Sequence, residues 1–315
     1  MEIAHACQVQ IEELVNQDFD LSIFGIKQYE RSSFLLRNYR IKTQHTLALI
    51  DTDDQPDLRK IEPGILPESG LDLLEINSND GERVVAYLEK FTGRSQADEI
   101  KILIDYSCMA QHWYAAIINY LYLKEIRCEK INVYFVYIPV SYSEPRKRAF
   151  KRDMQVILKD PVYLNSNITK KALILGLGYE MERADFLIRE VKPDIIYYFL
   201  SQPAFDERYT AKVLDLNDQL IHNRPGNLIP YPMSEMDKTV ELLTRLVLDL
   251  RLNYKVILAS FGPKLLTLAC LLLFARFPDI EILSAGSEHH AHHAETPINT
   301  PIIYKAVFLT DEKCE

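Results

Sequence analysis

The chain has 315 residues, with 36 basic and 45 acidic side chains and a formal net charge of −9. Its length predicts about two domains, and its 48% apolar and 26% charged residues exclude a disordered chain. The acidic balance argues against a direct nucleic-acid partner, because non-specific binding needs a positive surface; the basic run from Arg146 to Arg152 is expected to be a solvated linker.

Strands and helices are predicted in the same order twice. An amphipathic helix is expected over residues 1–18, and a final strand over 301–309. The first half gives strands at 21–25, 46–50, 101–105 and 131–137, with helices at 84–91 and 115–123. The second half gives strands at 172–176, 195–201, 255–259 and 280–283, with helices at 240–247 and 265–277. Continuous apolar strands between helices indicate parallel sheets covered on both faces.

One eight-residue motif occurs once in each half. Glu30–Arg37 reads ERSSFLLR, and Glu182–Arg189 reads ERADFLIR, with five of eight positions identical. The shared order of elements predicts an internal duplication. The fold class is therefore α/β, with two tandem Rossmann-like, doubly wound units at residues 1–165 and 166–315. The first carries the N-terminal helix, and the second carries the C-terminal strand.

Ligands of such sheets bind beyond the carboxyl ends of the strands, and two loops of the second half lie there. Gly176 and Gly178 let backbone N–H groups approach a phosphate, although Glu180 and Glu182 would repel it unless Arg183 offsets them; a plain tight turn is the alternative. In the second loop, Gly262 allows close backbone approach. Lys264 begins a helix, where the dipole disfavours a cation. It is expected to meet an anion or to extend into solvent.

The first half offers acidic and hydroxyl side chains at its strand ends. Asp105 could hold a ribose hydroxyl or a metal, and Ser107 could contact the ligand or cap the next helix. Residues 51–54, DTDD, could bind a divalent cation or form a solvated acidic turn. The repeated arginines, Arg31 and Arg183, could each bind phosphate bidentately or form an internal ion pair that fixes the loop.

The remaining reactive residues give no metal or redox assignment. The segment 288–295, EHHAHHAE, does not match a known zinc motif, so no metal role is assigned. Five scattered cysteines indicate free thiols in a reducing compartment. Cys108 precedes His112 by four residues, but a buried cysteine is the default reading. The N-terminus lacks a signal-peptide pattern, and the apolar run 265–275 is too short to cross a bilayer. A cytoplasmic protein without a membrane partner is expected.

The loop Ser260-Phe261-Gly262-Pro263-Lys264, followed by an apolar helix, resembles that of the CRISPR-associated Rossmann-fold (CARF) sensor domains. That family carries a Gly-Gly-Thr-Lys-like loop between a strand and a helix. Gly262 and Lys264 match it, while Phe261 and Pro263 replace the first glycine and the threonine. The resemblance covers about 30 residues. It implies binding of a cyclic oligonucleotide. The related SAVED domains are similar to two such units in one chain.

Three functions follow as hypotheses. The first is a cytoplasmic sensor or regulatory protein that binds a nucleotide or cyclic oligonucleotide in the cleft between its halves. The resemblance to CARF domains implies that it belongs to an antiviral defence system. Lys264, Arg183 and Arg31 would contact phosphates, and an effector protein or self-association would transmit the signal. The second is a Mg²⁺-dependent nucleotide hydrolase or nuclease that uses Glu180 and Glu182. The third is a non-catalytic scaffold. Whether the protein is an enzyme stays open.

Overall fold

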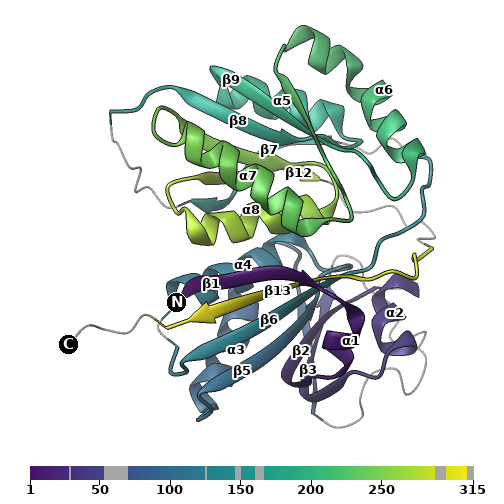
Figure 1. Cartoon of the computed structure of the whole chain (residues 1–315), viewed down its shortest axis with the longest axis vertical. Helices are drawn as coiled ribbons and strands as arrows, with labels where there is room; N and C mark the ends of the chain where they lie inside the picture. The colour runs from purple at the N-terminus through teal and green to yellow at the C-terminus, as the bar shows by residue number, and fades with distance from the viewer. Residues whose placement is uncertain are drawn as a thin grey trace. The chain divides into compact units, whose positions relative to one another are not determined.

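The computed structural model of the chain contains two mainly parallel sheets, each with helices packed against it (Figure 1). It describes residues 1–27, 30–52, 70–124, 126–145, 150–159, 167–287 and 296–310. The chain divides into two compact units, residues 1–141 with 292–315 and residues 142–291. The predicted pair of Rossmann-like α/β units is therefore confirmed. The acidic Asp53-Asp54, the basic Arg146-Lys147-Arg148, the 288–295 histidine segment and Cys314 lie outside the described residues.

Unit 1 contains a seven-stranded sheet in the order β1-β13-β6-β5-β2-β3-β4. Strands β6, β5, β2, β3 and β4 are parallel, and β13 runs antiparallel to both of its neighbours. The strands are β1 (Glu2–Val9), β2 (Asp18–Ile26), β3 (Lys42–Asp51), β4 (Leu71–Ile76), β5 (Glu99–Asp105), β6 (Lys130–Tyr137) and β13 (Ile302–Leu309). The helices are α1 (Ile11–Val15), α2 (Glu30–Asn38), α3 (Glu82–Arg94) and α4 (Gln111–Leu123).

Unit 2 contains a six-stranded sheet in the order β10-β9-β8-β11-β12-β7, with only β7 antiparallel. The strands are β7 (Phe150–Lys159), β8 (Lys171–Gly176), β9 (Ile195–Ser201), β10 (Asn227–Tyr231), β11 (Lys255–Ser260) and β12 (Glu281–Ser287). The helices are α5 (Met181–Val191), α6 (Glu207–Asn223), α7 (Met236–Leu250) and α8 (Lys264–Arg276). Apart from β1, the order matches that of unit 1.

The core of unit 2 follows from the helix patterns. Helices α5 and α6 each bury one apolar stripe, in a cluster with the sheet that includes Leu187, Val213 and Tyr198. Helix α8 is apolar all round and is buried from Leu265 to Ala275, as expected of a helix enclosed on every side. Helix α7 packs against it (Figure 1). No helix among the described residues is long and apolar enough to cross a membrane.

The connection between the units differs from the predicted division at residue 165. The final strand, β13, was assigned to the second unit, but it pairs with β1 and β6 in the sheet of unit 1. Residues 150–159 were placed in the first unit, with 150–152 expected in a linker, but they form strand β7, which pairs with β12 in unit 2. Unit 2 is thus inserted into unit 1 between β6 and β13. Local periodicity identifies a strand but does not say which sheet edge will pair with it.

The expected helix over residues 1–18 is wrong for most of its length. Residues Glu2–Val9 form β1, and only Ile11–Val15 are helical. β1 pairs with β13, so a partner from the other end of the chain supplies its hydrogen bonds. Tertiary pairing of this kind overrides local preference.

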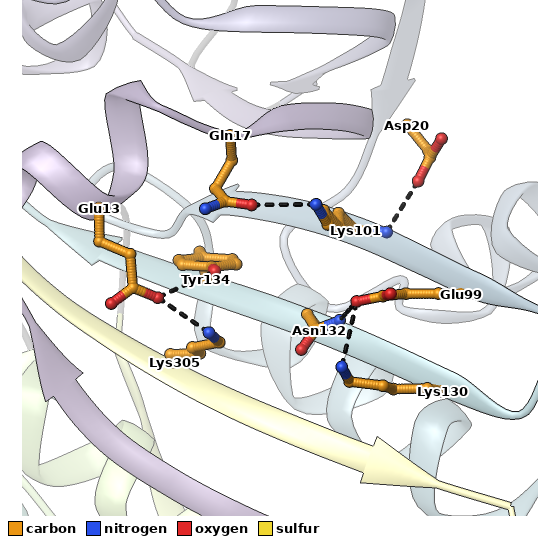
Figure 2. A network of polar contacts seen from close by, with 9 residues as sticks. All are labelled: Glu13, Gln17, Asp20, Glu99, Lys101, Lys130, Asn132, Tyr134 and Lys305. Carbon is orange, nitrogen blue, oxygen red and sulfur yellow. Dashed lines mark hydrogen bonds and ion pairs between the residues drawn. The ribbon is translucent and has the colours of Figure 1, made fainter.

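A polar network helps to hold β13 in unit 1 (Figure 2). The Glu13 Oε1 atom of α1 accepts hydrogen bonds from Lys305 Nζ of β13 at 2.8 Å and from Tyr134 OH of β6 at 3.1 Å. Farther along the sheet, Lys101 Nζ donates to Gln17 Oε1 at 3.0 Å. The segment Glu13–Gln17, which includes the end of α1, is therefore tied to three strands by side chains that point toward one another on this face of the sheet.

Candidate functional site at the switch points of the two sheets

Each sheet has a switch point where the strand order reverses. In unit 1 it lies between β2 and β5, and in unit 2 between β8 and β11. In doubly wound folds, ligands bind at the carboxyl edge of the sheet beside such a switch point. All ten predicted site residues lie at or just beyond these strand ends: Arg31, Asp105, Ser107, Gly176, Gly178, Glu180, Glu182, Arg183, Gly262 and Lys264.

At the switch point of unit 1, Arg31 and Ser107 meet the same peptide segment. Arg31 Nε donates to the Ile138 carbonyl at 2.7 Å, and the Ile138 amide donates to Ser107 Oγ at 2.8 Å. Asp105 Oδ1 in turn accepts from the Ser107 amide at 3.0 Å. Arg31, Asp105 and Ser107 are all buried. The structure thus brings together the three predicted residues of this unit and attaches them to the chain directly after β6.

A cluster of aromatic rings lies beside the Arg31 guanidinium, and the sequence patterns did not predict it. The central carbon of the guanidinium lies 4.8 Å from the centre of the Tyr137 ring, and Tyr106 packs against Tyr137 and Tyr114. Burial raises the pKa of Tyr106, and the neighbouring Tyr137, Tyr114 and Asp105 raise it further, while Arg31 opposes them. Tyr106 therefore stays protonated. Strand periodicity predicts buried rings here but does not predict that one of them packs against a guanidinium.

In unit 2 the two predicted glycine loops pack directly on each other. A side-chain carbon on Gly178 would lie 1.7 Å from the Phe261 carbonyl oxygen, and one on Gly262 would lie 2.9 Å from the Leu177 carbonyl oxygen. The Phe261 amide donates to the Gly176 carbonyl at 3.0 Å. Gly178 and Gly262 thus let two backbones approach each other, which accounts for both residues without a ligand.

The charged residues of unit 2 differ in their exposure. Arg183 lies over the Phe261 ring, 5.0 Å from its centre, and its Nη1 is 3.7 Å from Glu180 Oε1. Its side chain remains 15% exposed. Lys264, the first residue of α8, is half-buried, whereas Glu182 is exposed. Arg183 and Lys264 therefore lie in the first turns of the two helices that follow this switch point, while Glu182 is exposed.

The last residues of β9, β10 and β11 each carry a hydroxyl group at this edge of the sheet, and the sequence patterns did not predict them. Ser201 Oγ donates to Tyr231 OH at 2.7 Å, and the Tyr231 hydroxyl faces Gly262. Ser260 Oγ is buried and has no hydrogen-bond partner among the described residues. Hydroxyls at strand ends carry no spacing signal, so only the fold shows that they converge.

The chain segment that enters unit 2, residues 142–144, contacts α6 near this edge of the sheet. The Arg208 guanidinium lies over the Tyr142 ring, 5.0 Å from its centre, and Tyr142 OH donates to Glu144 Oε1 at 2.8 Å. Lys212 Nζ lies 3.9 Å from Glu144 Oε2. Burial raises the pKa of Tyr179, in the loop after β8, and Tyr142 and Glu144 contribute to the rise. The segment 142–144 and Tyr179 both contact the start of α6, since the Tyr209 ring packs on Tyr179 with 5.1 Å between the ring centres.

The chain is thus defined at the level of class as an α/β protein with two Rossmann-like units, each with polar loops at its switch point. No family model matches it, and no curated protein matches it. Among the residues that the structure describes, no group of three histidine, cysteine, aspartate or glutamate side chains is arranged to hold a metal ion. Glu180 is directed to Arg183 and Glu182 to solvent, so the two do not form a pair.

Proposed function

We propose that the protein is a regulatory, nucleotide-binding protein whose ligand binds at the switch point of unit 2. The observation that carries this proposal is the placement of Arg183 and Lys264 in the first turns of α5 and α8, the helices that follow β8 and β11. A phosphate at this position would meet two cations and the α8 N-terminus, whose free N–H groups favour an anion. A cyclic oligonucleotide, as in the resembling sensor families, is one ligand of this class.

Unit 2 is a better candidate than unit 1 because its cations are accessible. Arg183 and Lys264 are both partly exposed. In unit 1, Arg31 is buried against Tyr137 and bonded to Ile138. A buried arginine that already holds the backbone would have to break those contacts to receive a phosphate. Asp105 in unit 1 also aligns with the uncharged Ala259 of unit 2, since they pair with Phe24 and Leu175 respectively. The two switch points have therefore diverged.

The proposal is tested by thermal shift with Lys264→Ala and Arg183→Ala. The panel contains mono- and dinucleotides and cyclic oligonucleotides, each with and without Mg²⁺. A ligand at a hundredfold excess over its Kd stabilises the native state by about 2.7 kcal/mol. We expect the wild type to gain melting temperature with at least one nucleotide, and both variants to lose that gain.

Lys170→Ala is the matched control. It removes one positive charge just before β8, at the amino edge of the same sheet, and should respond to nucleotides like the wild type. If no nucleotide stabilises the wild type, or if Lys264→Ala and Arg183→Ala respond as Lys170→Ala does, the proposed site is wrong. Turnover of the bound nucleotide in the same samples would instead favour a hydrolase.

A further inference from the structure

We propose that the segment Ile138–Glu144 couples the buried cluster of unit 1 to the ligand site of unit 2. The inference rests on the proposed function for what it regulates, but the physical coupling does not depend on the ligand. The segment is the covalent connection from β6 into unit 2. Its two ends make side-chain and backbone contacts with the candidate sites of the two units.

At the unit 1 end, both polar groups of one peptide residue are held. The Ile138 amide donates to Ser107 Oγ, and the Ile138 carbonyl accepts from Arg31 Nε. Ile138 itself is fully buried. A change in the position of Arg31 or of the 105–107 loop must therefore move Ile138 or break a buried hydrogen bond, which is costly.

The middle of the segment is stiffened by pairing with the returning chain. The Ile298 amide donates to the Pro139 carbonyl at 2.8 Å, and the Ser141 amide donates to the Thr296 carbonyl at 2.9 Å. Val140 and Pro297 form an antiparallel bridge between them. Pro139 also has a fixed φ angle. As far as Ser141 the segment is therefore held by backbone hydrogen bonds, and Tyr142 follows it directly in the chain.

At the unit 2 end, the segment contacts side chains of α6. Arg208 lies over Tyr142, and Glu144 accepts from Tyr142 and faces Lys212. The Tyr209 ring, next to Arg208 on α6, packs on Tyr179 with 5.1 Å between the ring centres, and Tyr179 directly precedes Glu180, the partner of Arg183. Movement of Tyr142 and Glu144 would therefore change the surroundings of the Tyr179–Arg183 loop. Because coupling between sites is reciprocal, ligand at that loop would also change the order of the Arg31 cluster.

Hydrogen exchange of the full-length protein without ligand tests the coupling. Ser107→Ala removes the hydroxyl that holds Ile138. We expect faster amide exchange at Ile138, at 141–145 and also at 177–184 and 206–209 in unit 2, by about fivefold or more, the lower range of typical coupling. Thr92→Val is the matched control. It removes another buried hydroxyl of unit 1, which bonds to the Leu88 carbonyl and Tyr120 OH, away from the segment. Its effect should remain within unit 1.

Glu144→Gln tests the coupling from the other end and keeps the experiment decisive if Ser107→Ala folds poorly. Glu144 is exposed, so the variant should fold, and we expect faster exchange at Ile138 and 106–109. The proposal is overturned if the effect of Ser107→Ala ends at Ser141, or if that of Glu144→Gln stays within unit 2. Failure of the nucleotide panel together with exchange effects that cross the segment would refute the ligand but not the coupling. The opposite pair of results would refute the coupling alone.

Discussion

At the scale of single residues, the contact between Gly178 and Phe261 sets how closely the two loops of the unit 2 switch point can approach. The Phe261 carbonyl occupies the space that a side chain on residue 178 would need. The neighbouring Gly178 carbonyl accepts a hydrogen bond from Asn217 Nδ2 of α6 at 2.8 Å. Glycine at this position is therefore required by backbone packing between the loops, and Arg183 and Lys264 are positioned as a consequence.

Gly178→Ala should destabilise unit 2, because the added carbon meets a backbone atom that cannot rotate away. We expect a loss of about 1–3 kcal/mol or more in the free energy of unfolding, the usual cost of overpacking, measured by urea denaturation. The matched control is Gly93→Ala in α3, where nothing lies within 4 Å of the added carbon. That variant should gain up to about 1 kcal/mol, since alanine is the better helix former. Equal effects of the two substitutions would contradict this account.

Side-chain identity alone revealed part of the candidate site. The repeated arginines and the residues after the strands could be selected from the sequence, because the carboxyl edge of a parallel sheet is a defined place. The sequence could not show that the Tyr137 ring lies against the Arg31 guanidinium, nor that Tyr142 and Tyr179 both contact the start of α6. These contacts join residues far apart in the chain, and no local spacing encodes them.

At the scale of elements, α1 acts as a polar anchor for β13. Burial alone would raise the pKa of Glu13, but hydrogen bonds from Lys305 and Tyr134 and the charge of Lys305 outweigh it, so the pKa is lowered. The pKa of Glu99 on β5 is also lowered: burial opposes the shift, and Lys130, Asn132 and Lys101 cause it (Figure 2). Carboxylates with lowered pKa values stabilise the folded state only while they are ionised.

Unit 1 should therefore lose stability in acid. The contribution of Glu13 is complete above about pH 4.3, the ordinary value for glutamate, and is lost as the pH falls through the lowered pKa of the folded state. Glu13→Gln should weaken the protein at neutral pH by up to about 1 kcal/mol, as for a partly exposed ion pair, and should flatten the acid decline in thermal unfolding. Glu12→Gln, an exposed neighbour on α1, should keep the wild-type profile. A Glu13→Gln profile that parallels the wild type would disprove this role.

Most of the strands were predicted, but β4, β7, β10 and the helix α6 were not, and neither were the partners of the strands. Strands such as β5 and β11 are short apolar runs, and α8 is apolar on all sides, so composition and period identify them. Strand β1 was predicted as helix from its local pattern alone. The strand that supplies its hydrogen bonds, β13, lies about 300 residues later in the sequence. The parallel, doubly wound character of the two sheets followed from the alternation of strands and helices, whereas the places of β7 and β13 depend on long-range pairing.

At the scale of the whole molecule, unit 2 is a continuous insertion, and unit 1 is closed by the chain that returns from it. Deletion of residues 301–315 should therefore damage unit 1 selectively, because it removes the strand between β1 and β6. We expect loss of exchange protection in β1 and β6 and retained protection in β8 and β11. Leu252→Ser is the control, because Leu252 is exposed in the turn that follows α7. It should change exchange protection neither in β1 and β6 nor in β8 and β11. Equal loss of protection in both units would refute this prediction.

The insertion also has a consequence for biosynthesis. A ribosome makes β1 to β6 first, yet the sheet that they form lacks its antiparallel strand until residue 309 has emerged. All the strands of the inserted unit are complete by residue 287. Although domains commonly fold in the order of their synthesis, here the part translated later is complete first. The nascent N-terminal half must wait with the unpaired edge of β6 exposed, which is the kind of surface that chaperones protect from aggregation.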